Sequence, residues 1–575
     1  MSRKILIGLA AGALALAGCK QAETPTPAQT PETPATAGLP ASNHDFQPAI
    51  DAGDFTELVK VLASDEFEGR APGSTGEDRS VEYIRAQMQR IGLQPGNGDS
   101  YFQDVPMVET TADPATTLTL TIDGQPQQLA FGTDMVVATR TGQAQVSLKD
   151  SPVVFVGYGV NAPERDWNDY GDQDWTGKTV VMLVNDPGFH AKDDKLFDGN
   201  KMTYYGRWTY KFEEAARRGA AAALIVHDDA GASYGWDVVR NSWSGAQYDL
   251  PASDDPDPRL PIQGWLTAES ARKLFAGAGL ELEQAYRKAG KPGFKPIPLN
   301  ATASVELAST TADKTSRNVV GVLPGSSRAD EAVLYMAHWD HLGKHEGEEG
   351  TDTIYNGAVD NATGVAGILE IAEAFAHQEQ KPERSVVFVA VTLEESGLLG
   401  SKYYVAHPTV PLDKIAGVIN LDAMSVAGRS HDLVVTGKGN SELEDMLKVH
   451  ADGQGRVLAE ESNPAGGFYF RSDHFNFAKA GVPALYAKGG GDLVEGGAEA
   501  GKAAGAEYAK RYHQPSDEIH EGWRYEGIVE DLDALYGVGK DLAAGDRWPN
   551  WYAGNPFKAA RDAMMAAKAE AAPAP

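Results

Sequence analysis

The spacing of apolar residues divides the chain into segments that predict helices and segments that predict strands. Over residues 55–92, apolar positions recur every three or four residues, which is typical of a helix packed on one side, and Gly92 stands where a helix C-cap is expected. Over residues 115–148, apolar and polar positions alternate instead, as they do in half-buried strands. We therefore expect helix followed by strands near the start of the globular part.

A longer region, from residue 318 to about residue 542, alternates between short apolar runs and helical patterns. This alternation predicts an α/β fold in which a mostly parallel, mixed sheet is covered by helices on both faces. The predicted strands are residues 319–323, 332–337, 386–392, 417–421, 433–436 and 483–487. The predicted helices are residues 363–377, 398–406, 441–450 and 528–543.

Residues 149–300 have a different texture and predict a small, separate β-rich domain. Apolar, strand-like runs occupy residues 153–156, 180–184 and 220–226, and a helical pattern occupies residues 212–218. The flanking segments, residues 44–148 and 301–557, would then form one discontinuous domain around this insertion.

Both ends of the chain lack the apolar residues that a core requires. Residues 19–43 are rich in Pro, Thr, Ala and Gln, and residues 558–575 end in a run rich in Ala and Pro. Such compositions bury too little apolar surface to fold, so we expect a disordered tether and a disordered tail.

Residues 1–18 have the pattern of a secretory signal peptide, with basic residues, the apolar run 5–16 and small residues directly before Cys19. The apolar run is shorter than the roughly 20 residues that span a bilayer. Leu16-Ala17-Gly18-Cys19 resembles the bacterial lipobox, a signal that is cleaved before a lipid-modified cysteine. The resemblance implies a lipoprotein of the cell envelope, facing the periplasm from the outer membrane, that contacts the membrane only through the lipid on Cys19. An ordinary signal peptide with an incidental cysteine remains the alternative.

The charge balance narrows the range of partners. The 575-residue chain has 81 acidic and 51 basic residues, a formal net charge of -30. This excess opposes binding to nucleic acid and to anionic membrane surfaces, and it favours cationic partners such as the N-termini of peptides. Cys19 is the only cysteine, so the chain can form neither an intrachain disulfide nor a cysteine-based metal cage.

Charged residues follow several of the predicted strands, where the reactive groups of open α/β sheets collect. They are His338 and Asp340 after residues 332–337, Glu394 and Glu395 after residues 386–392, and Asp422 after residues 417–421. Asp360 precedes the helix predicted from residue 363, and His513 lies far downstream. A single acid in such a place is often a helix cap or a solvated residue, but several buried charges are costly unless they share a cation. Oxygen and imidazole ligands without thiolate favour zinc, with manganese or cobalt as alternatives.

These strand-end motifs resemble those of the co-catalytic dizinc aminopeptidases. That family includes secreted bacterial leucyl aminopeptidases and, more distantly, glutamate carboxypeptidase and the transferrin receptor. The order and approximate spacing of the motifs agree over residues 310–545. The matching motifs are His338-Trp339-Asp340, Val359-Asp360-Asn361-Ala362-Thr363-Gly364, Leu393-Glu394-Glu395-Ser396-Gly397, Asn420-Leu421-Asp422 and Tyr512-His513.

The resemblance implies a phosphorylase/hydrolase-like sandwich of a zinc peptidase and gives each motif a role. Asp360 would bridge a pair of zinc ions. The terminal ligands would be His338 and Asp422 for one ion, and Glu395 and His513 for the other. Glu394 would be the general base, and Asp340 would accept the second N–H of His338 and fix its tautomer. Relatives also have a cis peptide after the bridging aspartate, which here is the Asp360-Asn361 bond.

Three further expectations are less tightly tied to the motifs. Tyr469 stands where leucyl aminopeptidases carry a tyrosine that stabilises the oxyanion, although Phe468 and Phe470 beside it leave a plain aromatic wall as the alternative. His341 and His474 are expected to support the site or the structure rather than bind metal. Residues 149–300 resemble the protease-associated domain that is often inserted in these peptidases.

The sequence therefore predicts a metallo-exopeptidase that removes N-terminal residues from peptides. A carboxypeptidase, with Arg471 as the partner of a terminal carboxylate, or a dipeptidase would use the same site. A glutaminyl-cyclase-like transferase, which binds one zinc, and a non-catalytic binding protein are the more distant alternatives. Gly231-Ala232-Ser233-Tyr234-Gly235 fits the nucleophile elbow of a serine hydrolase, but the strand that such an elbow requires is not directly before it.

Overall fold

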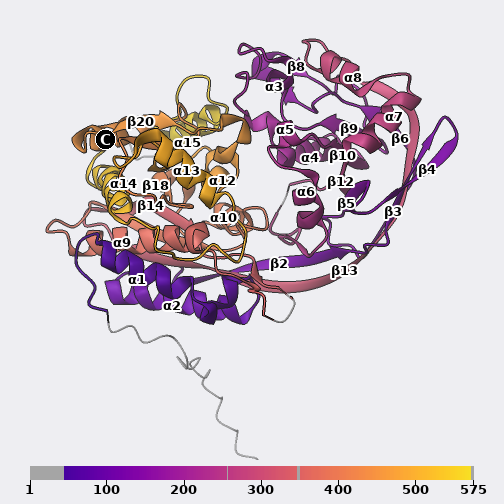
Figure 1. Ribbon diagram of the computed structural model, residues 1–575. Coiled ribbons are helices and arrows are strands. Elements are labelled where there is room, and N and C mark those ends of the chain that lie inside the picture. The colour runs from indigo at the N-terminus through magenta and orange to yellow at the C-terminus, as the bar shows by residue number, and fades with distance from the viewer. Residues whose placement is uncertain (1–43, 256, 346, 348–349, 572–575) are drawn as a thin grey trace, which may run out of the picture. The chain divides into compact units, whose positions relative to one another are not determined.

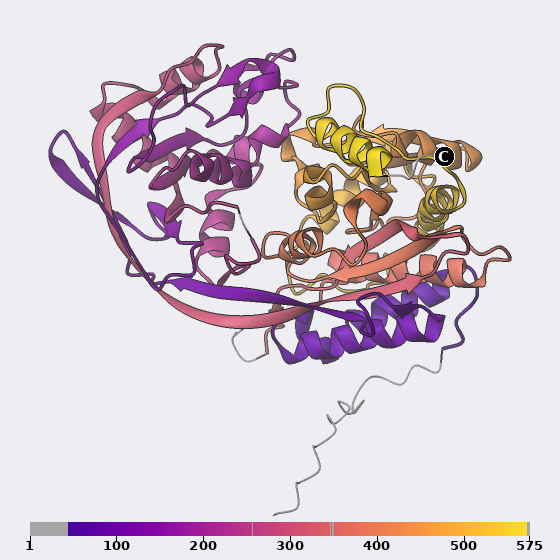
Figure 2. The same cartoon turned by 180° about the vertical axis from the view of Figure 1, so that it is seen from behind.

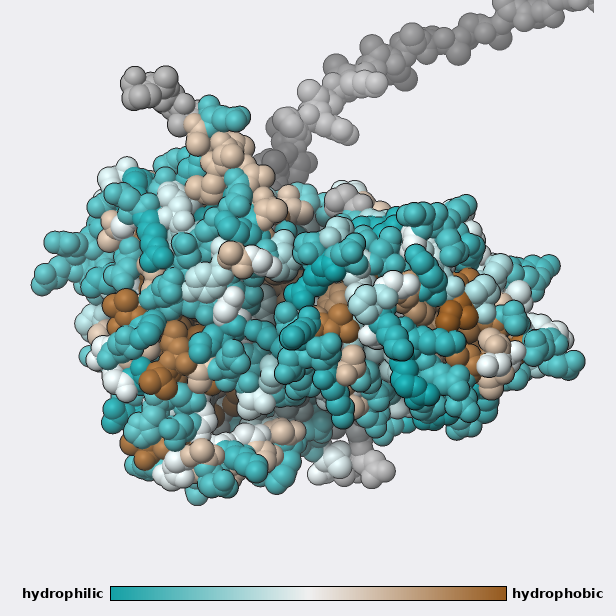
Figure 3. Space-filling model, turned by 90° about the horizontal axis from the view of Figure 1, so that it is seen from above, coloured by the Kyte–Doolittle hydropathy of each residue, from teal (hydrophilic) through white to brown (hydrophobic). Residues whose placement is uncertain are grey.

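The computed structural model describes residues 44–255, 257–345, 347 and 350–571 (Figure 1). The predicted signal peptide, the lipid-bearing Cys19 and the tether therefore lie outside the described residues, as do residues 572–575. Within the described ranges, no helix is both long enough and apolar enough to cross a membrane. The face shown in Figure 3 is mostly hydrophilic with small apolar patches, which agrees with the acidic composition.

The central part of the large sheet is parallel, as the alternating pattern predicted. Parallel neighbours run in the order β17 (Arg384–Val391), β14 (Arg328–His338), β18 (Ile415–Asn420) and β21 (Ala484–Gly489). Antiparallel strands flank this centre, with β13 (Ile297–Leu323) and β2 (Phe102–Ala112) on one side and β19 (Asp432–Val435) on the other. β20 (Val457–Glu460) pairs in parallel with β19. The mixed α/β fold class is confirmed.

Helices cover both faces of this sheet, which is why its central strands are unbroken apolar runs. Tyr335 of β14 packs against Phe375 of α9 (Thr363–His377), with 6.0 Å between ring centroids. The neighbouring residues Leu334 and Met336 point to the other face, into an apolar cluster with Phe475 of α12 (His474–Lys479). The bounds of α9 are those predicted from the sequence.

The segment before the sheet is helical, as its spacing predicted, and the helical residues are divided between two helices. α1 (Ala52–Leu62) and α2 (Thr75–Ile91) pack beside α9, and both lie along one side of the large sheet in the view of Figure 2. Gly92 is the C-cap of α2 with a φ of 91°, a left-handed conformation that glycine adopts without strain.

The inserted part has its own mixed sheet. Its parallel strands are β6 (Gln145–Phe155), β9 (Thr179–Leu183), β10 (Ala222–Val226) and β12 (Ile262–Leu266). Its antiparallel strands are β3 (Thr117–Ile122), β4 (Gln125–Ala130), β5 (Met135–Ala138) and the first half of β13. This part is β-rich, as expected, but its sheet has a parallel centre.

The structure corrects both predicted boundaries of the insertion. The boundary at residue 148 falls inside β6, and β3 to β5, expected in the flanking domain, pair within the inserted sheet. The boundary at residue 300 falls inside β13, which joins the inserted sheet through residues 297–308 and the large sheet through residues 309–323 (Figure 1). Alternation along the chain reveals a strand, but it does not reveal which sheet the strand joins.

The C-terminal segment is also different from the prediction. Residues 558–571, expected as part of a disordered tail, form α15 (Lys558–Ala571). Arg561 is buried, and it donates to the carbonyl oxygens of Ile415 and Ala416 at 3.3 Å. An alanine-rich composition is typical of low-complexity tails, but alanine is also the strongest helix former. Composition alone therefore does not distinguish a disordered tail from a helix that packs on the fold, as α15 does through Arg561.

Candidate metal centre

The carboxyl ends of adjacent parallel strands bring the predicted ligands together. β14 ends at His338, β18 is followed by Asp422, and β17 is followed by Glu394 and Glu395. The register pairs His338 with Val391 of β17 and Met336 with Asn420 of β18, so these strands end at the same edge. Asp360 lies in the turn directly before α9, in the short helical segment Ala358–Ala362.

Asp360 lies between the two predicted histidine ligands. Its Oδ1 is 3.2 Å from Nε2 of His338, and its Oδ2 is 3.2 Å from Nε2 of His513. Asp422 Oδ1 is 3.5 Å from the same nitrogen of His338, and Glu395 Oε2 is 3.2 Å from that of His513. Ligands at about 2.0–2.1 Å from a tetrahedral zinc ion are themselves about 3.3 Å apart. The five side chains therefore fit a pair of ions that share Asp360.

The imidazole nitrogens that face the carboxylates are available as ligands. Nε2 of His338 and Nε2 of His513 are buried and have no hydrogen-bond partner among the described residues. His338 Nδ1 lies 3.1 Å from the backbone oxygen of Asp340, and donation to that oxygen leaves Nε2 with a free lone pair. An unpaired buried nitrogen is costly unless it binds an ion, so this arrangement fits a metal.

The charges at this site favour a cation. Burial lowers the pKa of His338, but the charges of Glu394, Asp360 and Asp422 outweigh burial and raise it well above its ordinary value. Burial also lowers the pKa of His513, and Glu395 and Asp360 likewise raise it well above its ordinary value. The carboxylates thus favour positive charge beside the ring nitrogens, which a divalent ion supplies while the imidazoles stay neutral.

His341 is the second imidazole near Glu395. It is buried, and together with Asp360 and Glu395 it forms a group whose ligand atoms lie within 4.8 Å of one another. However, its Nδ1 lies 2.6 Å from Oε1 of Glu395, a hydrogen-bond length, whereas His513 Nε2 lies at ligand spacing from Asp360 and Glu395. This geometry fits the expectation that His341 supports Glu395 while His513 binds the ion.

Asp340 acts on different groups from those expected. Its carboxylate Oδ1 is 3.8 Å from Nδ1 of His338, too far for the predicted hydrogen bond. It accepts instead the backbone N–H groups of Glu394 at 3.1 Å and Glu395 at 3.4 Å. The backbone oxygen of Asp340, rather than its side chain, meets His338. Asp340 therefore orients the segment that carries the predicted base.

Glu394 has the environment of a group that takes up a proton. Burial raises its pKa well above the usual value, and the charges of Glu395 and Asp422 add to the increase against the opposing effect of His338. A carboxylate whose pKa is raised is suited to accept a proton and return it.

Two buried residues that the sequence did not identify hold the Asp360 turn. Asp517 accepts the backbone N–H groups of Val359 and Asp360, both at 3.1 Å. The guanidinium of Arg70 donates to carbonyl oxygens on three segments of the site. The acceptors are Leu62, Trp339, Asn356 and Gly357, at 2.6 to 2.8 Å. Asp517 follows the Tyr512-His513 motif closely, whereas nothing in the sequence distinguishes Arg70 from other arginines. The predicted cis peptide Asp360-Asn361 is present.

The structure does not bring the hydroxyl of Tyr469 to the carboxylate cluster. The Tyr469 ring packs on His474 with 4.6 Å between centroids, and its buried hydroxyl has no partner among the described residues. Burial raises the pKa of Tyr469, and the carboxylate that adds to the shift is Glu444, not a residue of the site. The predicted role of Tyr469 is therefore corrected to a wall residue.

Tyr512 is the tyrosine that faces the cluster. Its ring stacks on His513, with 3.9 Å between centroids and 23° between planes. Although 49% of its surface is exposed, desolvation and then the charges of Asp360, Glu395 and Glu394 raise its pKa well above the usual value. The signal in the sequence was its position directly before the predicted ligand His513.

The serine-hydrolase alternative fails on geometry. β10 ends at Val226, and α5 (Asp229–Ala232) separates that strand from Ser233. The Ser233 hydroxyl accepts a hydrogen bond from Arg471 at 3.0 Å rather than from a histidine. Ser233 is therefore not at a nucleophile elbow.

Comparison with known proteins gives one family match. Residues 318–530 match peptidase family M28. Leupeptin-inactivating enzyme 1 of Streptomyces exfoliatus is 29% identical over 216 residues, which are 36% of this chain and 45% of that protein. Leucine aminopeptidase 2 of Arthroderma otae is 26% identical over 231 residues, 38% of this chain and 43% of that protein. The chain thus matches less than half the length of each of these relatives.

Among solved structures, the aminopeptidase from Aneurinibacillus sp. strain AM-1 is similar. It is 20% identical, with a TM-score of 0.46, and the match covers 86% of this chain and 94% of that chain.

Proposed function

We propose that the chain, whose residues 318–530 match peptidase family M28, is a zinc metallo-exopeptidase that removes N-terminal residues from peptides. The observation that carries the proposal is the position of Asp360, which directs one oxygen to each of two unpartnered imidazole nitrogens beside Glu394. A one-zinc transferase would not need a ligand set of this kind on both sides of Asp360.

The side chains present fit a pair of zinc ions. His338 and Asp422 would hold one ion, Glu395 and His513 the other, and Asp360 both. Imidazole and carboxylate ligands without thiolate suit zinc, although manganese and cobalt accept the same donors. When bound, such a pair lowers the pKa of an attacking water and polarises the substrate carbonyl.

The other residues of the site then have separate tasks. Glu394 accepts the proton of the attacking water and donates it to the nitrogen of the leaving amine. Asp340 fixes Glu394 through its backbone N–H, so that the carboxylate stays in position for both transfers. The hydroxyl of Tyr512 donates a hydrogen bond to the oxyanion that forms on the scissile carbonyl. Arg70 and Asp517 hold the Asp360 turn in place.

Hydrolysis of one short peptide in three forms tests which end is recognised. The acidic cluster favours a substrate with a cationic α-amine, so the free peptide should be cleaved and the N-acetylated peptide should not. Cleavage of the C-amidated peptide should persist. Cleavage that survives acetylation and disappears on amidation would contradict the proposal and favour a carboxypeptidase.

We also propose that the chain is attached to the cell envelope by a lipid on Cys19, and that the inserted part is a protease-associated domain. The lipobox-like Leu16-Ala17-Gly18-Cys19 supports the lipid, and the motifs and β-rich composition of the insertion support the domain assignment. Fractionation of cells that express the wild-type chain or C19A tests the attachment. The wild type should remain with membranes and C19A should be released.

A further inference from the structure

β21, the strand that neighbours β18, reaches the backbone of the predicted ligand Asp422. The two strands are parallel, and their register places Tyr486 opposite Asn420, two residues before Asp422. Tyr486 is buried, and its hydroxyl donates to the backbone oxygen of Asp422 at 3.0 Å. A side chain of the neighbouring strand therefore holds the main chain from which the ligand projects.

Lys488 acts on the same turn. It lies two residues after Tyr486, so the two side chains are on the same face of β21. Its Nζ donates to the backbone oxygen of Ala423 at 2.8 Å. Its contacts with the backbone oxygen of Asp422 and with the Tyr486 hydroxyl are longer, 3.4 Å each. The carbonyl groups of two successive residues are thus held from one strand.

These bonds stabilise a backbone conformation that alanine disfavours. Ala423 directly follows Asp422 and has a φ of 47°, a left-handed conformation in which the Cβ atom crowds the carbonyl oxygen. The N–H of Ala423 donates to Oδ1 of Asn361 at 3.2 Å, and its carbonyl oxygen accepts from Lys488. Without Lys488 this residue would have less reason to stay left-handed, and a change of its φ would turn the peptide that carries Asp422.

The end of β21 is itself fixed to the core, so that it can hold another segment. The backbone N–H of Gly489 donates to Oδ2 of Asp531 in α14 (Glu526–Ala544) at 2.6 Å. Oδ1 of Asp531 pairs with Arg456 at 2.7 Å, and both of these side chains are buried. Lys488 also pairs with Val434 of β19 in the sheet. Tyr486 and Lys488 therefore extend from a strand that is anchored on both sides.

We propose that Tyr486 and Lys488 are positioning residues that set the affinity for the zinc ion assigned to His338 and Asp422. The inference rests on the proposed function, which assigns Asp422 to only one of two ions. Groups that hold a ligand in place raise metal affinity, because the ligand is already ordered before the ion binds. Loss of either residue should therefore weaken the binding of one ion and spare the other.

Titration of the metal-free protein with zinc, in competition with a chromophoric chelator, tests this role. The wild type should give two association constants. In Y486F and in K488M one constant should fall by at least about tenfold, the size expected when a group that orients a ligand is removed. The other constant should stay within about threefold of the wild-type value. K488R should keep part of the affinity, because a guanidinium group also donates to a backbone oxygen.

Activity at two zinc concentrations separates positioning from a general loss of structure. With limiting zinc, Y486F and K488M should be less active than the wild type. With excess zinc, kcat should return to within a few fold of the wild-type value, because the weakened position is then occupied. Damage to the fold would not be repaired by added zinc.

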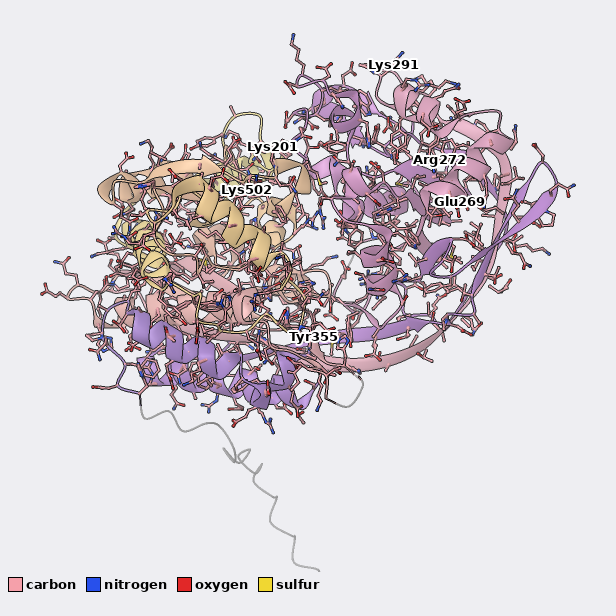
Figure 4. All side chains as sticks on the ribbon, viewed as in Figure 1. Lys201, Glu269, Arg272, Lys291, Tyr355 and Lys502 are labelled. Carbon is pink, nitrogen blue, oxygen red and sulfur yellow. The ribbon has the colours of Figure 1, made fainter. Side chains whose placement is uncertain are left out.

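Two side chains with the same kinds of bond provide matched controls. The buried hydroxyl of Tyr335 donates to the backbone oxygen of Leu535 at 2.9 Å. Lys201, labelled in Figure 4, donates to the backbone oxygen of Lys438 at 2.9 Å. Neither acceptor adjoins a predicted metal ligand, so Y335F and K201M should keep both association constants.

Thermal unfolding of the metal-free variants shows which of them are folded, and Y486F and K488M test the role independently of each other. Unchanged zinc constants in a folded variant, equal weakening of both ions, or the same loss in the controls would overturn the inference alone. A wild-type chain that binds no zinc and cleaves no peptide would contradict the proposed function instead.

Discussion

Both sheets of the molecule place charged residues after parallel strands, yet the two sets have different environments. In the inserted part, Asp228 follows β10, and its carboxylate lies 2.8 Å from Nε2 of His190. The other ring nitrogen of His190 lies 3.0 Å from the hydroxyl of Tyr158, so both nitrogens have partners. After the parallel strands of the large sheet, Nε2 of His338 and of His513 have no partners in the described structure.

The carboxylates show the same contrast. Asp169 of the inserted part accepts backbone N–H groups from Tyr158 and Val160 and the indole N–H of Trp167, at 2.8 to 3.1 Å. Asp360 directs its two oxygens to unpartnered imidazoles instead. The two groups of potential metal ligands found in the described residues both contain Asp360. A charged residue at a strand end is therefore not sufficient evidence of a metal site, whereas two unpartnered imidazole nitrogens at ligand spacing from one carboxylate indicate such a site.

The largest effect should come from the glutamate pair that follows β17. E394Q should lower kcat by about 10²–10⁴-fold and retain metal, because it removes a proton acceptor and not a ligand. E395Q should lower kcat and also lose metal, because Oε2 of Glu395 lies 3.2 Å from Nε2 of His513, the spacing expected for two ligands of one ion. Metal content and kcat, measured on the same preparations, separate the two roles.

The inserted sheet supplies the comparison for this pair. D169N changes a buried carboxylate that is saturated by N–H donors, so kcat should stay at the wild-type value. Metal loss in E394Q together with metal retention in E395Q would reverse our assignment within the pair.

The next largest effect should distinguish two tyrosines. Y512F should lower kcat by about 10²-fold, the size expected when a donor to an oxyanion is removed. Y469F should leave kcat within a few fold, because the Tyr469 ring packs on His474 and its hydroxyl does not face the carboxylates. Steady-state kinetics on one peptide decides between them. A loss confined to Y469F would restore the role that the sequence predicted for that residue.

The smallest effect should be on stability alone. In the wild type, the carboxylate of Asp169 accepts hydrogen bonds from N–H donors. In D169N the amide turns an N–H group toward one of these donors, and the lost hydrogen bond should lower the free energy of unfolding by about 1–3 kcal/mol. Chemical denaturation of the metal-loaded protein measures this cost. A large decrease in kcat of folded D169N would show that the inserted cluster takes part in the reaction and would remove the contrast between the two regions.

Much of the large sheet and its helices could be predicted because their signals in the sequence are local. The period of apolar residues gave α9 its bounds, and the strand-end motifs identified side chains that the structure brings within 3.5 Å of one another. Adjacent parallel strands must end at the same edge, so order along the chain was enough to predict that these residues meet.

The predictions that failed depend on contacts between distant segments. β3 to β5 show strand alternation, but only their pairing assigns them to the inserted sheet. The position of a tyrosine in the sequence does not reveal where its hydroxyl points, so the sequence predicts a role for Tyr469 and does not identify Tyr512. α15 packs on the fold through Arg561, which donates to the carbonyl oxygens of Ile415 and Ala416, far away in the sequence.

The number of metal ions bound by the active chain tests the central claim most directly. Native mass spectrometry of the purified, active protein should show two divalent ions per chain. After exhaustive chelation, the chain should be folded, free of metal and inactive. A chain that retains full activity without metal would contradict the account.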